Sequence, residues 1–156
     1  MKLPAYSERI RRTAAVVAKA HVFVIRSSGG RVGRRWRGGE VVLLCTIGRH
    51  SGRRRTTPLV CIRDGDDVVV VASCGGSDRT PDWWLNLQAR PEAELQFDGR
   101  MRPVVTRDLS GVERARLAER FARAFPCFEE YRSRTERTIP VVALRERHAA
   151  DQQRSA

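Results

Sequence analysis

Residues 41–73 read VVLLCTIGRHSGRRRTTPLVCIRDGDDVVVVAS, and no other part of the chain is as informative about its fold. Three runs in this stretch, 41–47, 57–63 and 67–73, are rich in β-branched and aliphatic residues, which is typical of strands. Asp64-Gly65 separates the second run from the third and favours a tight hairpin turn. We therefore predict consecutive antiparallel strands.

The same pattern continues further along the chain. Two strand-like runs, 93–97 and 100–107, flank Asp98-Gly99, which repeats the hairpin signal, and 138–144 supplies a final strand. About six antiparallel strands with helices in their connections predict a mainly β protein of the α+β class, in which a small barrel carries packed helices.

Two connections have the signals of helices. Over 80–89, Thr80 is expected to cap the helix, followed by a proline in its first turn. Over 112–125, Ser110 and Glu113 have the spacing of a capping box. Another short helix is predicted directly after this one.

The N-terminal region precedes the strands. Residues 4–26 place apolar side chains at helical spacing with basic residues between them, which predicts an amphipathic helix with a basic face. Such a helix either covers one end of the core or lies on an anionic membrane surface. A connector rich in glycine and arginine follows, in which we expect no regular element. We divide the chain into this N-terminal region (1–39), the barrel (40–145) and a polar tail (146–156).

The net charge of the chain indicates an anionic partner but does not identify which one. Lysine and arginine number 30 against 18 acidic residues, a formal net charge of +12, which attracts nucleic acid, an anionic membrane or an anionic cofactor. We find no run long enough to span a membrane and no signal peptide, so we expect a cytoplasmic protein, with peripheral contact at the inner face of the membrane as an addition. The four cysteines and three histidines show no metal-binding spacing.

The turn GRHSGRRRTTP, residues 48–58, is the segment best suited to bind a ligand. Its glycines let backbone N–H groups approach an anion, and its hydroxyl and guanidinium groups match phosphate and carboxylate oxygens. A solvated hairpin tip, whose arginines only protect an exposed edge, explains the local sequence equally well.

A resemblance extends this reading beyond the turn. Together with segments 28–33, 71–76, 83–87 and 137–142, in colinear order over residues 20–145, the turn resembles the deazaflavin (F420)-dependent nitroreductase family, in its quinone-reductase-like branch. The resemblance implies a split β-barrel of the FMN-binding, pyridoxamine-oxidase-like type. It also implies an enzyme that binds reduced coenzyme F420 (F420H2), without a metal, and transfers its hydride to a quinone-like or nitroaromatic acceptor.

The resemblance also implies the site residues. The tail of F420 carries a phosphate and glutamates, and the residues implied for this end are Arg49, His50, Ser51, Gly52, Arg55, Thr56 and Thr57. Those implied around the ring and over the cofactor are Pro58, Ala72, Ser73, Cys74, Gly75, Gly76, Arg79, Trp83 and Asn86. We expect Phe125, Phe128 and Tyr131 to bind the acceptor, with Ser73 and Tyr131 as hydrogen-bond donors in catalysis.

Three alternatives stay open at this point. A basic nucleic-acid binding module fits the charge, but the arginines are spread over nearly every segment and no DNA- or RNA-binding motif is present. A related split barrel could hold another cofactor, such as a flavin or haem, because a fold does not fix its ligand. A protein that binds F420 without catalysis would have the same sequence features. The sequence does not indicate an oligomeric state.

Overall fold

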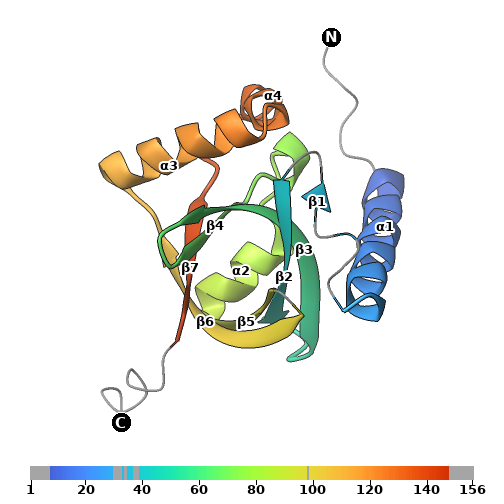
Figure 1. Cartoon of the computed structure of the whole chain (residues 1–156). Helices are drawn as coiled ribbons and strands as arrows, with labels where there is room; N and C mark the ends of the chain where they lie inside the picture. Colours follow the sequence, from blue (N-terminus) through green and yellow to red (C-terminus); the bar gives the residue numbers. More distant parts are fainter. Residues whose placement is uncertain (1–7, 30–32, 34, 37–38, 98, 148–156) are drawn as a thin grey trace.

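The computed structural model describes residues 8–29, 33, 35–36, 39–97 and 99–147 (Figure 1). The start of the predicted N-terminal helix, parts of the connector and most of the predicted tail lie outside these residues. In chain order the elements are α1 (Glu8–Ser27), β1 (Arg35–Trp36), β2 (Gly39–Ile47), β3 (Arg54–Asp64), β4 (Asp67–Val71), the 3-10 turn η1 (Cys74–Gly76), α2 (Asp82–Ala89), β5 (Glu92–Phe97), β6 (Arg100–Asp108), α3 (Gly111–Ala124), α4 (Cys127–Ser133) and β7 (Val141–Glu146).

The sheet closes into a barrel, as predicted. Its strand order is β1-β2-β3-β4-β7-β6-β5, and β5 also pairs with β2, so six antiparallel strands form a complete ring. The short strand β1 pairs with the first residues of β2. It lies in the connector, in which we expected no regular element. That expectation was wrong because Arg35 and Trp36 pair with Glu40 and Gly39, a tertiary contact that local composition does not reveal.

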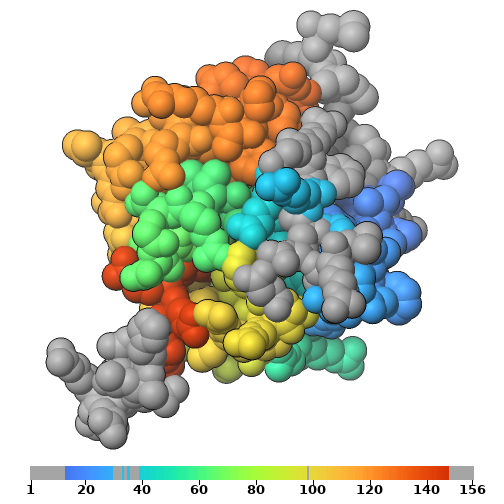
Figure 2. Space-filling model, viewed as in Figure 1, coloured from blue at the N-terminus to red at the C-terminus, as the bar shows by residue number. Residues whose placement is uncertain are grey.

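Three hydrophobic clusters join the helices to the barrel. Inside the ring, β-strand residues such as Val42 and Val70 pack against Trp83, Trp84 and Leu87 of α2. A second cluster lies under α3 and α4, whose orange surface forms one layer on the barrel (Figures 1 and 2). The third holds α1 on the outside of the barrel. One helix, α2, thus lies inside the ring, while α3 and α4 cover one side of it from outside and α1 packs against β3 from outside.

Several element boundaries differ from the prediction. β3 begins at Arg54 rather than at residue 57, because pairing of Ile47 with Arg54 extends the ladder into the basic turn. β7 begins at Val141 rather than at residue 138, since only from Val141 onward does this strand pair with β4.

Of the two predicted helix caps, one is at the predicted residue and one is not. Pro81 rather than Thr80 occupies the N-cap of α2, and it has an extended backbone conformation. Ser110 is the N-cap of α3, but its side chain makes no capping hydrogen bond. Glu113 instead accepts two hydrogen bonds from Arg107, at 2.7 and 3.0 Å. Because Arg107 engages both oxygens of the Glu113 carboxylate, this side chain does not turn back to the start of the helix, and the capping box does not form.

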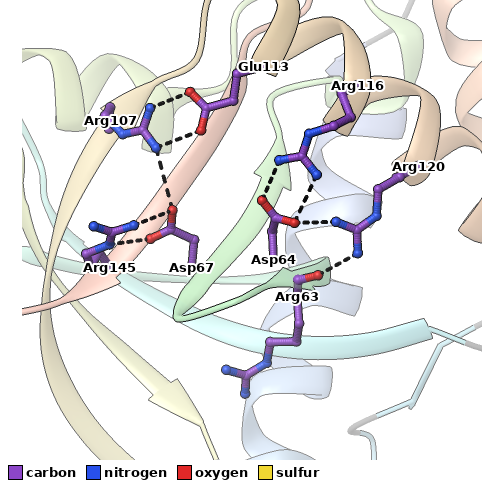
Figure 3. Close-up of polar contacts among 8 residues, drawn as sticks. All are labelled: Arg63, Asp64, Asp67, Arg107, Glu113, Arg116, Arg120 and Arg145. Atoms are coloured by element: carbon purple, nitrogen blue, oxygen red, sulfur yellow. Dashed lines mark hydrogen bonds and ion pairs between the residues drawn. The ribbon is translucent and has the colours of Figure 1, made fainter.

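Polar contacts fasten α3 to the barrel (Figure 3). Asp64, at the end of β3, accepts hydrogen bonds from Arg116, at 2.7 and 3.1 Å, and from Arg120. On the neighbouring strands, Asp67 is held by Arg145 at 2.7 and 3.0 Å. The bonds of Asp64 fix α3 against the end of β3, whereas the Asp67–Arg145 pair joins β4 to β7. On the inner face of α3, Leu117 and Phe121 are buried against the barrel.

Replacing Asp64 with asparagine should lower the free energy of unfolding by about 1 kcal/mol at pH 7, because the charged hydrogen bonds to α3 are lost. The guanidinium groups of Arg116 and Arg120 lower the pKa of Asp64 in the folded protein. Its stabilisation is therefore present above the ordinary aspartate pKa of about 3.9 and is lost as the pH falls through the lowered value. Urea unfolding of both proteins measures this, and a difference that stays constant down to pH 2 would contradict it.

Candidate functional site

A polar cavity of about 660 Å³ lies between α1, the turn after β2, and α2. Eight of the residues expected to bind the cofactor line it, although they come from two separate segments of the chain. The lining residues are Ala15, Ala18, Lys19, Val22, Gly48, Arg49, His50, Ser51, Arg54, Arg55, Thr56, Thr57, Asp82, Trp83 and Asn86.

The turn after β2 is held in a defined shape. The N–H of Gly48 donates to the carbonyl of Arg53 at 2.9 Å, and the N–H of Gly52 donates to the carbonyl of Gly48 at 2.8 Å. Gly52 has φ +65°, a conformation that favours glycine. A Cβ on Gly48 would lie 2.6 Å from Ser51 Oγ, so this glycine lets the hydroxyl fold back over the turn.

Asn86 supports the same turn from α2. Its side chain is buried, and its Oδ1 accepts hydrogen bonds from the backbone N–H of Arg49 at 3.1 Å and from the Arg49 guanidinium at 3.3 Å. Its Nδ2 donates to Thr46 Oγ1 at 3.1 Å. Asn86 therefore positions the turn, a role that the sequence did not suggest.

The cations around the polar cavity differ in their partners. Arg49 pairs with Asp82 at 3.2 Å, and Arg54 pairs with Glu94. Within the part of the chain that the structure describes, Lys19 and Arg55 have no carboxylate partner. The cavity thus combines uncompensated positive charge with hydroxyl groups, a donor set that fits phosphate and carboxylate oxygens.

An apolar cavity of about 380 Å³ adjoins the polar one under α1. Ala18 lines both, and along β3 the lining passes from Thr57 in the polar cavity to Pro58 in the apolar one. Its lining residues are Ala14, Val17, Ala18, His21, Val41, Pro58, Leu59, Val60, Val71, Ser73, Phe121, Phe125, Cys127, Phe128 and Tyr131. A ligand with a charged tail and a flat apolar ring has a matching surface along this path.

The structure gathers the expected acceptor residues in the apolar cavity. Phe125 and Phe128 pack on Phe121, with ring centroids 4.8 and 5.2 Å apart. Ser73, just after β4, and Tyr131, on α4, add hydroxyl groups to a wall that is otherwise mostly apolar. Aromatic faces with few polar groups suit a flat, weakly polar molecule.

Several residues expected to bind the cofactor line neither cavity, and most of them lie in the loop and the 3-10 turn that follow β4. This loop is held by Arg137, which donates hydrogen bonds to the carbonyls of Ala72 and Ser73, at 2.8 and 2.9 Å. In η1, a Cβ on Gly76 would lie 2.8 Å from the Tyr131 carbonyl oxygen, so this glycine permits contact with α4. The residues that line neither cavity are Gly52, Ala72, Cys74, Gly75, Gly76 and Arg79.

Sequence reasoning missed the contribution of α1. Lys19 lines the polar cavity, and Val17 and His21 line the apolar one. The spacing of Ala14, Ala18 and His21 indicates one helical face, but which part of the barrel this face meets depends on the tertiary fold. Phe121, on α3, lines the apolar cavity as well, although we did not predict it as a site residue.

The described residues contain no group of three or more histidine, cysteine, aspartate or glutamate side chains that could hold a metal ion. Among the same residues, no helix is both long and apolar enough to cross a bilayer.

The chain is similar to several known proteins. The F420H(2)-dependent quinone reductase Rv1261c of Mycobacterium tuberculosis strain H37Rv is 34% identical over 148 residues, which cover 88% of this chain and 95% of the relative. A solved structure of an F420-H2 dependent reductase (FDR-A) is 33% identical, with a TM-score of 0.62, and the match covers 69% of this chain and 94% of that one.

Two further structures extend the comparison. A solved domain-swapped dimer is 30% identical, with a TM-score of 0.64 over 85% of this chain and 98% of that one. HutZ, a heme storage protein from Vibrio cholerae, has a TM-score of 0.54 over 74% of this chain and 86% of that one, but at 10% identity it shows the fold alone. The model of the F420H(2)-dependent quinone reductase family matches residues 17–146, and the chain belongs to this family.

Proposed function

We propose that this protein transfers a hydride from F420H2 to a quinone-like acceptor, with nitroaromatic compounds as further substrates. The observation that carries the proposal is the adjacency of the two cavities along β3. One offers cations without carboxylate partners, and the other offers an aromatic wall with two hydroxyl groups. Membership of the F420H(2)-dependent quinone reductase family supports F420 as the cofactor that would occupy this path.

The residues of the polar cavity would hold the anionic tail of the cofactor. Arg55 is available for a charge-assisted bond without breaking an existing ion pair, whereas Arg49 would exchange Asp82 for the ligand. Backbone and hydroxyl donors of the rigid turn would complete the site. The lining residues that carry such donors are His50, Ser51, Thr56 and Thr57.

The apolar cavity would organise the reaction. A reduced deazaflavin supplies a hydride when it is bound. Phe125 and Phe128 would orient a flat acceptor and keep water away from it, while Ser73 and Tyr131 would donate hydrogen bonds to the acceptor oxygen on which negative charge develops. Tyr131 or solvent would then deliver the proton that completes the reduction.

Titration of the purified protein with F420 and with flavin mononucleotide, followed by fluorescence, tests the cofactor. We expect saturable binding of F420 and much weaker binding of the flavin. Each ligand has a ring system and a phosphate, but only F420 carries the chain of glutamates that a cavity with several cations can hold. Tight binding of the flavin together with no binding of F420 would overturn the proposal.

Replacing Ser73 with alanine and Tyr131 with phenylalanine in one protein should lower kcat/KM for menadione by about tenfold, because two hydrogen bonds to the developing charge are lost. The affinity for F420 should fall less than kcat/KM does. Ser133→Ala is the matched control, since this hydroxyl lies on the same helix as Tyr131 but outside the apolar cavity. Wild-type turnover in the double variant would remove both residues from the mechanism.

We also propose that the outer face of α1 contacts an anionic membrane surface. Val16, Phe23 and Val24 are 65%, 71% and 41% exposed there, on a chain with a net charge of +12. An exposed apolar face combined with positive charge favours an interfacial position.

Sedimentation with vesicles tests this contact. We expect binding to vesicles that contain phosphatidylserine, little binding to pure phosphatidylcholine, and release at high salt. Phe23→Ser should weaken the binding, whereas Val112→Ser, at a still more exposed site on α3, should not. Equal recovery with neutral and anionic vesicles would contradict the proposal.

A further inference from the structure

One flank of α1 carries two basic residues, Lys19 and Arg26, which are seven positions apart and therefore lie on the same side of the helix. Arg26 donates a hydrogen bond to Thr56 Oγ1 at 3.2 Å, and Thr56 belongs to the lining of the polar cavity. Lys19 lines the polar cavity directly. This flank of the helix thus lies beside the part of β3 that lines the polar cavity.

Lys19 and Arg55 approach the cavity from different elements. Both are positively charged, and neither has a carboxylate partner within the described residues. Two like charges that face one cavity repel each other unless an anion lies between them. This arrangement favours a ligand that carries more than one negative charge and reaches from the barrel to α1.

The opposite flank of α1 belongs to the apolar cavity. Val17 and His21 line it, and Ala18 lies in the lining of both cavities. The helix is attached mainly through its second half, where Ile25 is buried against the barrel and His21 Nε2 lies 2.8 Å from the Gly33 carbonyl oxygen. Residues 13–17 and Lys19, which precede this attachment, are exposed.

From this arrangement we infer that α1 forms the second wall of the polar cavity. Lys19 binds the negatively charged tail of F420 from the side opposite Arg55. This inference rests on the proposed function and adds a residue and an element to it. Because the same helix walls the acceptor cavity, binding of the tail would also restrict the position of Val17 and His21. The tail would then do more than supply affinity, since it would help to shape the cavity for the acceptor.

The first test measures affinity by fluorescence titration with two probes, F420 and the tail-free deazaflavin riboside, which lacks the phosphate and the glutamates. Lys19→Met should weaken binding of F420 by about fivefold, as expected for one exposed ion pair, and leave binding of the riboside unchanged. Lys19→Arg should restore most of the loss. Arg123→Met, an exposed position on α3, controls for the change in net charge.

The outcomes of this test separate the two proposals. If the wild-type protein does not bind F420, the proposed function and this inference both fail. If it binds F420 and Lys19→Met binds equally well, or loses affinity for both probes alike, only the role of Lys19 is overturned. A loss as large in Arg123→Met would also overturn it, because long-range charge would then explain the effect.

The second test measures amide hydrogen exchange over residues 13–26. F420 should slow exchange in this segment of the wild-type protein, because a bound tail restrains the helix. The riboside should slow it less, and Lys19→Met should remove most of the difference between the two ligands. Equal protection by both ligands would show that α1 does not sense the tail and would overturn the inference.

Discussion

Replacing Arg55 with methionine should weaken binding of F420 by about 30-fold, which corresponds to roughly 2 kcal/mol for a lost hydrogen-bonded ion pair. Arg55 is expected to have the largest effect among the cations because it lines the polar cavity and has no carboxylate partner in the described structure. A Cβ on Gly48 would lie 3.7 Å from Arg55 Nε, so the guanidinium group of Arg55 lies close to the backbone of the turn. Fluorescence titration at fixed ionic strength measures the change.

Arg53→Met is the matched control for this variant. Arg53 belongs to the same basic turn and is exposed, but it does not line the polar cavity. We expect its loss to change the affinity by less than about threefold, as for a screened surface charge. The role of Arg55 would be contradicted if both variants lost affinity equally, or if Arg55→Met bound F420 as the wild type does.

Replacing Phe121 with alanine should lower the free energy of unfolding by about 3–5 kcal/mol, the usual cost of removing a buried aromatic ring. Phe121 is 1% exposed and packs on Phe125 and Phe128. Because its ring also lines the apolar cavity, KM for menadione should rise, while the affinity for F420 should hold at a temperature where the variant is folded.

Urea unfolding and steady-state kinetics on the same preparation check both parts of this prediction. Val112→Ala is the control on α3, since Val112 is 86% exposed and should contribute less than about 0.5 kcal/mol. A loss of less than 1 kcal/mol in Phe121→Ala would show that the layer under α3 packs differently. An unchanged KM would separate Phe121 from the acceptor cavity.

The strands could be predicted because their signals are local. Asp64-Gly65 marks a turn between runs of β-branched residues, and Asp64 does pair with Asp67 across it. Closure of the barrel has no such signal, because it depends on β2 pairing with β5, where Leu44 lies opposite Leu95. The residues themselves supported a small barrel only through the number of strands, and the split barrel was expected from the family resemblance. Pairing between distant segments closes the ring.

The same distinction explains the site. The basic turn is contiguous, so its donors could be recognised together, and the structure indeed places Arg49, Ser51 and Arg55 around one cavity. Lys19 could not be predicted as a cavity residue, because its position relative to the turn depends on where α1 packs on the barrel. Asn86 was expected near the cofactor, but its hydrogen bonds to the backbone of the turn could be seen only in three dimensions.

The most direct measurement follows the absorbance of F420H2 after menadione is added to the wild-type protein under anaerobic conditions. If the two adjoining cavities hold a deazaflavin and its acceptor together, F420H2 should be oxidised in proportion to the menadione reduced, at a rate that depends on the enzyme concentration. Reduced flavin mononucleotide should not replace it. Binding of F420 without any enzyme-dependent oxidation by menadione would contradict the account.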